Sequence, residues 1–108
     1  MLTEATLTHH LQAFGEGVGA ILSDYTEDSV LFTPNGPVRG LEGLRTFFDG
    51  FIRNSPPELL DAMRLIRQDV DGEVAYIIWK AEPYITMATD TFVIRNGKIM
   101  VQTFAALS

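Results

Sequence analysis

The second half of the chain contains two pairs of strand-like segments, each joined by a dipeptide that is typical of tight turns. Polar and hydrophobic residues alternate in "AMRLIRQDV" and "EVAYIIWKA", which flank Asp71-Gly72, and in "ITMATDTFVIR" and "KIMVQTFAAL", which flank Asn96-Gly97. Asp-Gly and Asn-Gly tolerate the positive φ angles of two-residue hairpin turns. We therefore expect two antiparallel β-hairpins, and any fold of this chain must accommodate them.

The Asn96-Gly97 turn fixes which residues of the last hairpin face one another, and it places an acid on the hydrophobic side. Side chains two apart on a strand share a face, so Asp90 lies on the face that carries Phe92 and Ile94. An ionised carboxylate without a partner is costly there, or its pKa shifts until it is neutral. Counted from the turn, the expected cross-strand pairs are Arg95–Lys98, Ile94–Ile99, Phe92–Val101 and Asp90–Thr103.

Two interpretations of Asp90 remain open at this point. It is either an acid that opens into a cavity or a partly solvated acid, hydrogen-bonded to Thr103, Thr33 or a backbone amide. Counting from Asp71-Gly72 also places Trp79 opposite Arg64, which suits a cation–π contact. The other face of the last hairpin is mixed, as in exposed or interface surfaces, and its expected residues are Thr89, Thr91, Val93, Met100, Gln102 and Phe104.

The first half of the chain has helical periodicity. One buried stripe predicts a helix over about residues 3–14, and its members are Leu7, Leu11, Phe14 and Val18. At about 100° per residue, His10 falls near this stripe, whereas His9 points nearly opposite. The glycines of "GEGVG" interrupt the pattern and leave at most a short second helix through Ile21 and Leu22.

A strand and a second long helix complete the first half. "SVLFT" is a β-branched and aromatic run, and "PNGP" supplies the turn that ends it. "LEGLRTFFDGFIRN" carries a wide hydrophobic face and predicts a helix that Pro56 and Pro57 end. Helices followed by antiparallel strands indicate an α+β protein with helices on one face of a sheet.

Composition excludes several classes of function. The chain has no cysteine, which excludes disulfides and thiol catalysis, and its net charge of −6 argues against a nucleic-acid partner. His9 and His10 lie on opposite helix faces, so we expect no metal site, and no cofactor motif is present. No apolar run is long enough for a membrane span and no leader is visible, so we expect a cytoplasmic protein.

Two segments carry a resemblance to a known superfamily. "YTEDSVLFTPNGPVRGLEGLRTFF" and "DTFVIRNGKIMVQTF", in this order and spacing, resemble the NTF2-like superfamily, which includes ketosteroid isomerases and SnoaL-like polyketide cyclases. The resemblance implies a single domain over residues 1–108 with the cystatin-like α+β cone. In this fold a strongly curved antiparallel or mixed sheet wraps a long helix, N-terminal helices complete the cone, and a hydrophobic pocket opens on the concave face. It also implies a homodimer through the outer sheet face.

The resemblance assigns expected roles to particular residues. Asp90 matches the protonated acid of ketosteroid isomerases, which donates to the substrate oxyanion from a "D-x-F" strand. Thr33 occupies the position of their general base, so this base is missing. His10 together with Asp90 is closer to the SnoaL-like pattern, with His10 as a base near neutrality that Asp90 orients or assists. We expect substrate contacts from Thr33, Phe48, Phe92, Thr103 and Trp79.

Two classes of function follow from these expectations. The first is a ketosteroid isomerase-like or polyketide cyclase-like isomerase or lyase, in which Asp90 and His10 perform acid–base chemistry on a small apolar carbonyl compound. The second is a non-catalytic ligand-binding or dimerisation module. An open cavity of several hundred Å³ favours a ligand, while a pocket filled by Phe and Met side chains favours the module.

Overall fold

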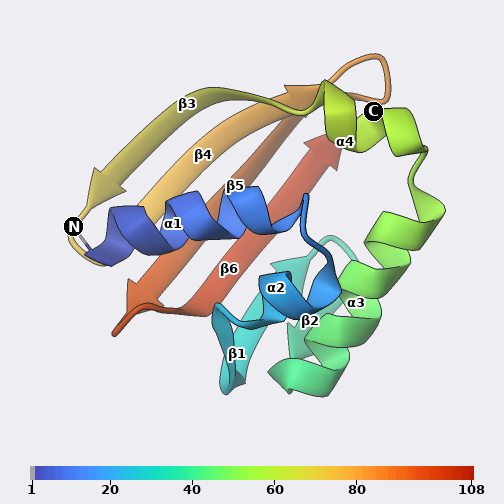
Figure 1. Ribbon diagram of the computed structural model, residues 1–108. Coiled ribbons are helices and arrows are strands. Elements are labelled where there is room, and N and C mark those ends of the chain that lie inside the picture. Colours follow the sequence, from blue (N-terminus) through green and yellow to red (C-terminus); the bar gives the residue numbers. More distant parts are fainter. Residues whose placement is uncertain (1) are drawn as a thin grey trace.

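The computed structural model describes residues 2–108, and in this part of the chain a six-stranded sheet carries helices on one face (Figure 1). Met1, which the domain prediction included, lies outside the described residues. The helices are α1 (Leu2–Ala13), α2 (Val18–Leu22), α3 (Gly40–Asn54) and α4 (Pro57–Ala62). The strands are β1 (Tyr25–Thr33), β2 (Gly36–Arg39), β3 (Arg64–Asp71), β4 (Val74–Ala81), β5 (Ile85–Arg95) and β6 (Lys98–Leu107).

The sheet is mixed and curved, with the strand order β2-β1-β6-β5-β4-β3. β1 runs parallel to β6, and every other neighbouring pair is antiparallel. α1 lies across β4 and β5, whereas α3 packs against β1 and β2, so the helices cover the concave side from two directions (Figure 1). The α+β class and the NTF2-like architecture predicted from the sequence are confirmed.

The long helix α3 begins and ends where its flanking residues dictate. Gly40 has φ 75°, and a Cβ at this position would lie 3.1 Å from Glu27 Oε1. The same carboxylate oxygen accepts a hydrogen bond from the Leu41 backbone N–H at 3.1 Å, which satisfies one free donor of the first turn. The hydrophobic face of the helix buries Leu44 and Phe48, and the helix ends before Pro56.

The Asn96-Gly97 turn is confirmed, but the register predicted for the rest of its hairpin is wrong. Both turn residues have positive φ (53° and 76°), and Ile94 pairs with Ile99 as expected. The next pair is Val93 with Val101, so Met100 is an extra residue, a β-bulge. Beyond the bulge, each β6 residue faces the sheet side opposite to the one expected.

The bulge changes the cross-strand partners of Asp90 and of Phe92. Asp90 pairs with Phe104 rather than with Thr103, and Phe92 pairs with Gln102 rather than with Val101. Gln102 is 3% exposed and therefore inside, while Thr103 is exposed. Gln102 and Phe104 thus leave the outer face that the sequence suggested for them.

The central hairpin also turns one residue later than predicted. Asp71 pairs with Val74, so the turn residues are Gly72 and Glu73. A register shift follows between Leu65 and Arg67, after which Trp79 pairs with Leu65. Arg64 instead pairs with Lys80, and the expected Trp79–Arg64 pair is wrong.

None of the helices in residues 2–108 is both long enough and apolar enough to span a membrane.

Candidate functional site

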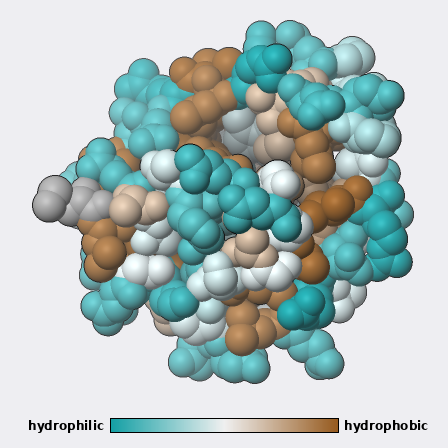
Figure 2. Space-filling model, in the orientation of Figure 1, coloured by the Kyte–Doolittle hydropathy of each residue, from teal (hydrophilic) through white to brown (hydrophobic). Residues whose placement is uncertain are grey.

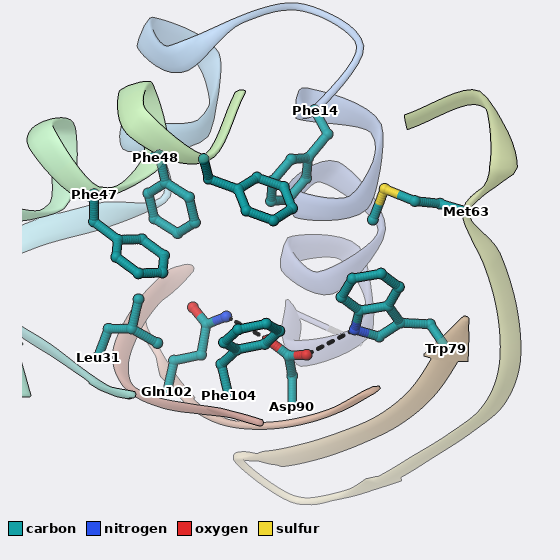
Figure 3. A pocket seen from close by; sticks show the side chains of 10 residues that line it. Phe14, Leu31, Phe47, Phe48, Met63, Trp79, Asp90, Gln102 and Phe104 are labelled. Carbon is teal, nitrogen blue, oxygen red and sulfur yellow. Dashed lines mark hydrogen bonds between the residues drawn. The ribbon is translucent and has the colours of Figure 1, made fainter. Parts of the chain in front are cut away.

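Asp90 lies on the concave face of β5 and is 6% exposed. Its two carboxylate oxygens accept hydrogen bonds from different donors: Trp79 Nε1 to Oδ1 at 2.8 Å and Gln102 Nε2 to Oδ2 at 2.8 Å. Figure 3 shows the indole of Trp79 and the amide of Gln102 converging on this carboxyl group from opposite sides. Strand alternation on β5 and β4 brings Asp90 and Trp79 inward, and the Met100 bulge brings Gln102.

Burial raises the pKa of Asp90 from its ordinary 3.8 to about 6, although the hydrogen bonds from Trp79 and Gln102 oppose the shift. Desolvation disfavours the charged form, and donors to the carboxylate favour it. At pH 7 the group is therefore mostly ionised, yet it takes up a proton within a unit of neutrality. A carboxyl group with this pKa suits proton transfer in either direction.

Tyr25 extends this hydrogen-bonded group toward β1. Its hydroxyl donates to Gln102 Oε1 across the parallel pairing of β1 with β6. Tyr25 is 4% exposed, so the contact is shielded from water. No sequence pattern singled out Tyr25, and the predicted register placed Gln102 on the wrong face.

His10 occupies a different environment from the one its expected role requires. It is 2% exposed, and its ring meets four aromatic rings at their edges, those of Phe14, Tyr25, Phe48 and Phe92. Burial, with a smaller effect of His9, lowers the pKa of His10 to about 3. Among the described residues its Nδ1 has no hydrogen-bond partner. His10 is thus uncharged at neutral pH, and the expectation of a near-neutral base oriented by Asp90 is wrong.

His9 points away from the interior, as the helical spacing predicted. Its side chain is 47% exposed, and Nδ1 contacts both oxygens of Asp24 at 2.8 and 2.9 Å. The hydrogen bond and charge of Asp24 raise the pKa of His9. This pair connects α1 to the segment before β1.

Two adjoining cavities meet at Asp90. The smaller has a volume of about 40 Å³ and lies among Phe47, Phe48, Phe51 and Phe104 (Figure 3). The larger has a volume of about 790 Å³ and opens between α1, α4 and the sheet, where Figure 2 shows a hollow bordered by both hydrophobic and hydrophilic residues. Asp90, Trp79, Met63 and Phe14 line both.

The larger cavity has an apolar interior and a polar edge. Its apolar wall includes Leu11, Ile52, Leu60, Ile77 and Phe92, and His10 also lines it. Charged side chains line it from the end of α3, from α4 and from the start of β3: Arg53, Asp61 and Arg64. An apolar wall with few polar groups is typical of small-molecule sites.

The predicted substrate contacts divide into two groups. Trp79 lines both cavities, Phe92 the larger one and Phe48 the smaller one. Thr33 and Thr103 line neither. Thr33 is the last residue of β1, where its hydroxyl donates to Gly36 O at 2.9 Å. Thr103 Oγ1 accepts from the Thr91 N–H on the outer face. The structure therefore does not bring Thr33 or Thr103 together with Asp90 at either cavity.

Residues 2–108 contain no group of three or more His, Cys, Asp or Glu side chains that could hold a metal ion.

Solved structures with the same fold include one described as SnoaL-like, one described as a polyketide cyclase, and TerC. One from Burkholderia thailandensis E264, of unknown function, is 14% identical with a TM-score of 0.80, covering 99% of this chain and 96% of that one. A candidate polyketide cyclase from Sinorhizobium meliloti is 14% identical with a TM-score of 0.78 and 94% coverage of both chains. TerC, crystallised with polyporic acid, is 16% identical with a TM-score of 0.73, covering 99% and 92%.

At these identities the structural similarity shows the fold alone. No curated protein matches the sequence. The family model described as "SnoaL-like domain" matches residues 7–102, which is most of the chain. The chain therefore belongs to the SnoaL-like domain family, within the NTF2-like superfamily.

Proposed function

We propose that this SnoaL-like domain binds a small apolar carbonyl compound in the larger cavity and that Asp90 acts on it as a general base. The observation that carries the proposal is the position of Asp90, a buried carboxyl group at the boundary of a 790 Å³ cavity. This volume falls within the range of about 300–1,000 Å³ that is common for small-molecule sites. The smaller cavity, at about 40 Å³, has room for little more than water.

The hydrogen bonds of Asp90 leave it able to accept a proton. Trp79 and Gln102 each occupy one acceptor position, one on each oxygen. A carboxylate has about four such positions, so others remain for a substrate proton. Because the pKa of Asp90 is about 6, the carboxylate predominates at neutral pH and is ready to accept a proton. The same pKa allows the resulting carboxylic acid to hold that proton until it is returned.

The proposed step is removal of a proton from a carbon next to a carbonyl group. The C–H bond breaks, an O–H bond forms on Asp90, and the electron pair moves to the carbonyl oxygen to give an enolate. Return of the proton to another carbon isomerises the compound. Attack of the enolate carbon on a second carbonyl of the same molecule instead breaks the C=O π bond of that carbonyl and closes a ring, and the resulting alkoxide takes the proton back from Asp90. The polyketide cyclase description of one structural neighbour supports this variant.

This role differs from the neutral oxyanion donor that the ketosteroid isomerase resemblance implied for Asp90. A donor role requires a second group as base, but the Thr33 hydroxyl donates to Gly36 O at the end of β1 and His10 has a pKa of about 3. Of His10 and Asp90, which both line the larger cavity, Asp90 has the pKa nearer to the value that a neutral-pH base requires. We propose that His10 contributes as an uncharged ring in the cavity wall, with Phe92 and Trp79 as apolar contacts.

The test is turnover and binding of apolar diketones and polyketide-like compounds by wild type and Asp90→Asn. Asn keeps the size of the side chain and removes the base, so we expect turnover to fall by about 10²- to 10⁴-fold while binding persists. The rate of wild type should decline below about pH 6, where Asp90 becomes protonated. Asp69→Asn is the control, since this acid is exposed on β3 and paired with Arg67. Equal turnover by wild type and Asp90→Asn would refute the proposal.

A second candidate is a non-catalytic ligand-binding or dimerisation module. The observation that favours it is the outer sheet surface, where Met87 and Leu107 are 42% and 64% exposed on paired strands. A homodimer through this face would cover them. Sedimentation at high micromolar concentration tests the dimer, and a monomer would contradict it. Tight binding of a carbonyl compound without turnover would favour the binding module over the enzyme.

A further inference from the structure

Three buried side chains from three strands form a hydrogen-bonded series that ends at Asp90. Tyr25 on β1 donates to Gln102 Oε1 on β6, and Gln102 Nε2 donates to Asp90 Oδ2 on β5 at 2.8 Å. Their exposed fractions are 4%, 3% and 6%, respectively. Water has little access to this series, so each group depends on its protein partner.

Donor and acceptor chemistry gives the series one direction when Asp90 is ionised. A carboxylate only accepts, so the amide of Gln102 must turn its N–H toward Asp90 and its carbonyl toward Tyr25. The Tyr25 hydroxyl then donates to that carbonyl. Burial raises the pKa of Tyr25 well above its ordinary value, with smaller effects of Asp90 and Asp24, so the hydroxyl keeps its proton for this bond.

The partners of Asp90 also restrict where a proton can reside on it. Trp79 Nε1 is only a donor, and Gln102 presents a donor in this orientation. Neither can accept a hydrogen bond from a protonated Asp90. The proton must therefore lie at an acceptor position that these two donors leave free, and the surface of Asp90 that they leave free lines the cavities.

We propose that Tyr25 is a positioning residue that acts through Gln102: it fixes the amide so that Gln102 donates to Asp90, which favours the ionised form and confines the Asp90 proton to the cavity side. The inference rests on the proposed function of Asp90 as a base. Removal of the Tyr25 hydroxyl leaves the Gln102 carbonyl without its donor, and the amide is then free to rotate and present its oxygen to a protonated Asp90.

Other ionisable groups around Asp90 remain in place in this experiment. They line the larger cavity from α1, α3, α4 and β3: His10, Arg53, Asp61 and Arg64. Tyr25→Phe keeps the ring that meets the His10 ring, and neither substitution removes a charge from this set. A shift in the pKa of Asp90 therefore reports on the hydrogen-bonded series.

The experiment is a carbon-13 NMR titration of the Asp90 carboxyl group in the whole chain, without ligand. Gln102→Met keeps a similar shape and removes the donor, so the pKa of Asp90 should rise above about 6 by about one unit. Tyr25→Phe keeps the ring that packs near Phe48 and should raise it by a smaller amount. If Tyr25 acts through Gln102, adding Tyr25→Phe to Gln102→Met should cause no further rise.

Tyr76→Phe is the matched control, because it removes a tyrosine hydroxyl on the opposite face of β4 from Trp79. The inference would be overturned if the pKa of Asp90 were the same in the Tyr25→Phe and Tyr76→Phe variants. A lower pKa in Tyr25→Phe would also overturn it, because this indicates that Gln102 accepts from a protonated Asp90 in the wild type. If Gln102→Met fails to fold, the sign of the Tyr25→Phe shift decides alone.

The same titration separates this inference from the proposed function. A rise in the pKa of Asp90 in a protein that turns over no carbonyl compound would support the positioning role and refute the enzyme. Loss of turnover in Asp90→Asn, with no shift in Tyr25→Phe, would support the enzyme and refute the positioning role.

Discussion

Substitution of Asp90 by Asn should become more favourable to the stability of the protein as the pH rises from acid to neutral. The pKa of Asp90 in the folded protein is about 6, against an ordinary value of 3.8. Between these values the folded protein retains a proton that the unfolded chain releases, so stability falls as pH rises. At about 1.4 kcal/mol per pKa unit, the ionised carboxylate costs about 3 kcal/mol of stability above pH 6.

Asn at this position does not titrate, so the difference in unfolding free energy between the variant and wild type isolates Asp90. We expect this difference to move in favour of Asp90→Asn by about 3 kcal/mol between about pH 3.5 and 7.5. Guanidinium unfolding at a series of pH values measures this difference. A change of about 3 kcal/mol is easily resolved, because the total stability of a typical domain is only about 5–15 kcal/mol. Any constant offset reflects hydrogen bonds that Asn makes or loses with Trp79 and Gln102.

A difference that stays constant with pH would show that Asp90 is not desolvated in the folded protein. A difference that moves in favour of wild type as pH rises would show that the carboxylate is stabilised rather than destabilised by its site. Either result refutes the reasoning that makes Asp90 a base. Asp69 is an exposed acid paired with Arg67. The Asp69→Asn variant therefore shows how the difference in unfolding free energy changes with pH when the acid is not buried.

Three further predictions concern parts of the fold that hold the site. Contact with Asp24 raises the pKa of His9, so wild type should be more stable than His9→Gln below about pH 6.5. This advantage should disappear as the pH rises through the pKa of His9 in the folded protein, and thermal unfolding at about pH 6 and pH 9 measures it. Leu44→Ala empties a fully buried position on α3 and should cost about 2–5 kcal/mol in denaturant unfolding; a loss under 1 kcal/mol would contradict the packing. Gly40→Ala forces a side chain into positive φ beside Glu27 and should cost at least about 1 kcal/mol, whereas Gly19→Ala, with open space around it, is the control.

Local patterns were sufficient for the features that depend on one segment. Helical spacing alone distinguished the buried His10 from the exposed His9, because a rotation of 100° per residue separates neighbours widely. Strand alternation alone placed Asp90 inside, because its parity with Phe92 does not depend on any partner strand. Asn96-Gly97 supplied the hairpin turn for the same local reason.

Features that depend on two strands were not accessible in this way. A β-bulge adds one residue to one strand, and nothing in "KIMVQTF" distinguishes Met100 as that residue. The predicted partner of Asp90 was therefore Thr103, one position away from the inward-facing Gln102. The pKa of His10 was misjudged for a related reason, since three of the four rings around it, those of Tyr25, Phe48 and Phe92, come from β1, α3 and β5.

The bulge has a chemical consequence beyond the register. With Thr103 inside, the residue facing Asp90 would carry a hydroxyl, which can donate to a carboxylate or accept from a carboxylic acid with equal ease. Gln102 has both kinds of group but at different atoms, and the bond from Tyr25 selects which one Asp90 meets. The extra residue in β6 thus replaces a partner that tolerates either protonation state of Asp90 with one that favours the ionised state. On this argument the character of Asp90 as a base is set by cross-strand register, and a relative that keeps the aspartate but lacks the bulge would hold a different acid in the same place.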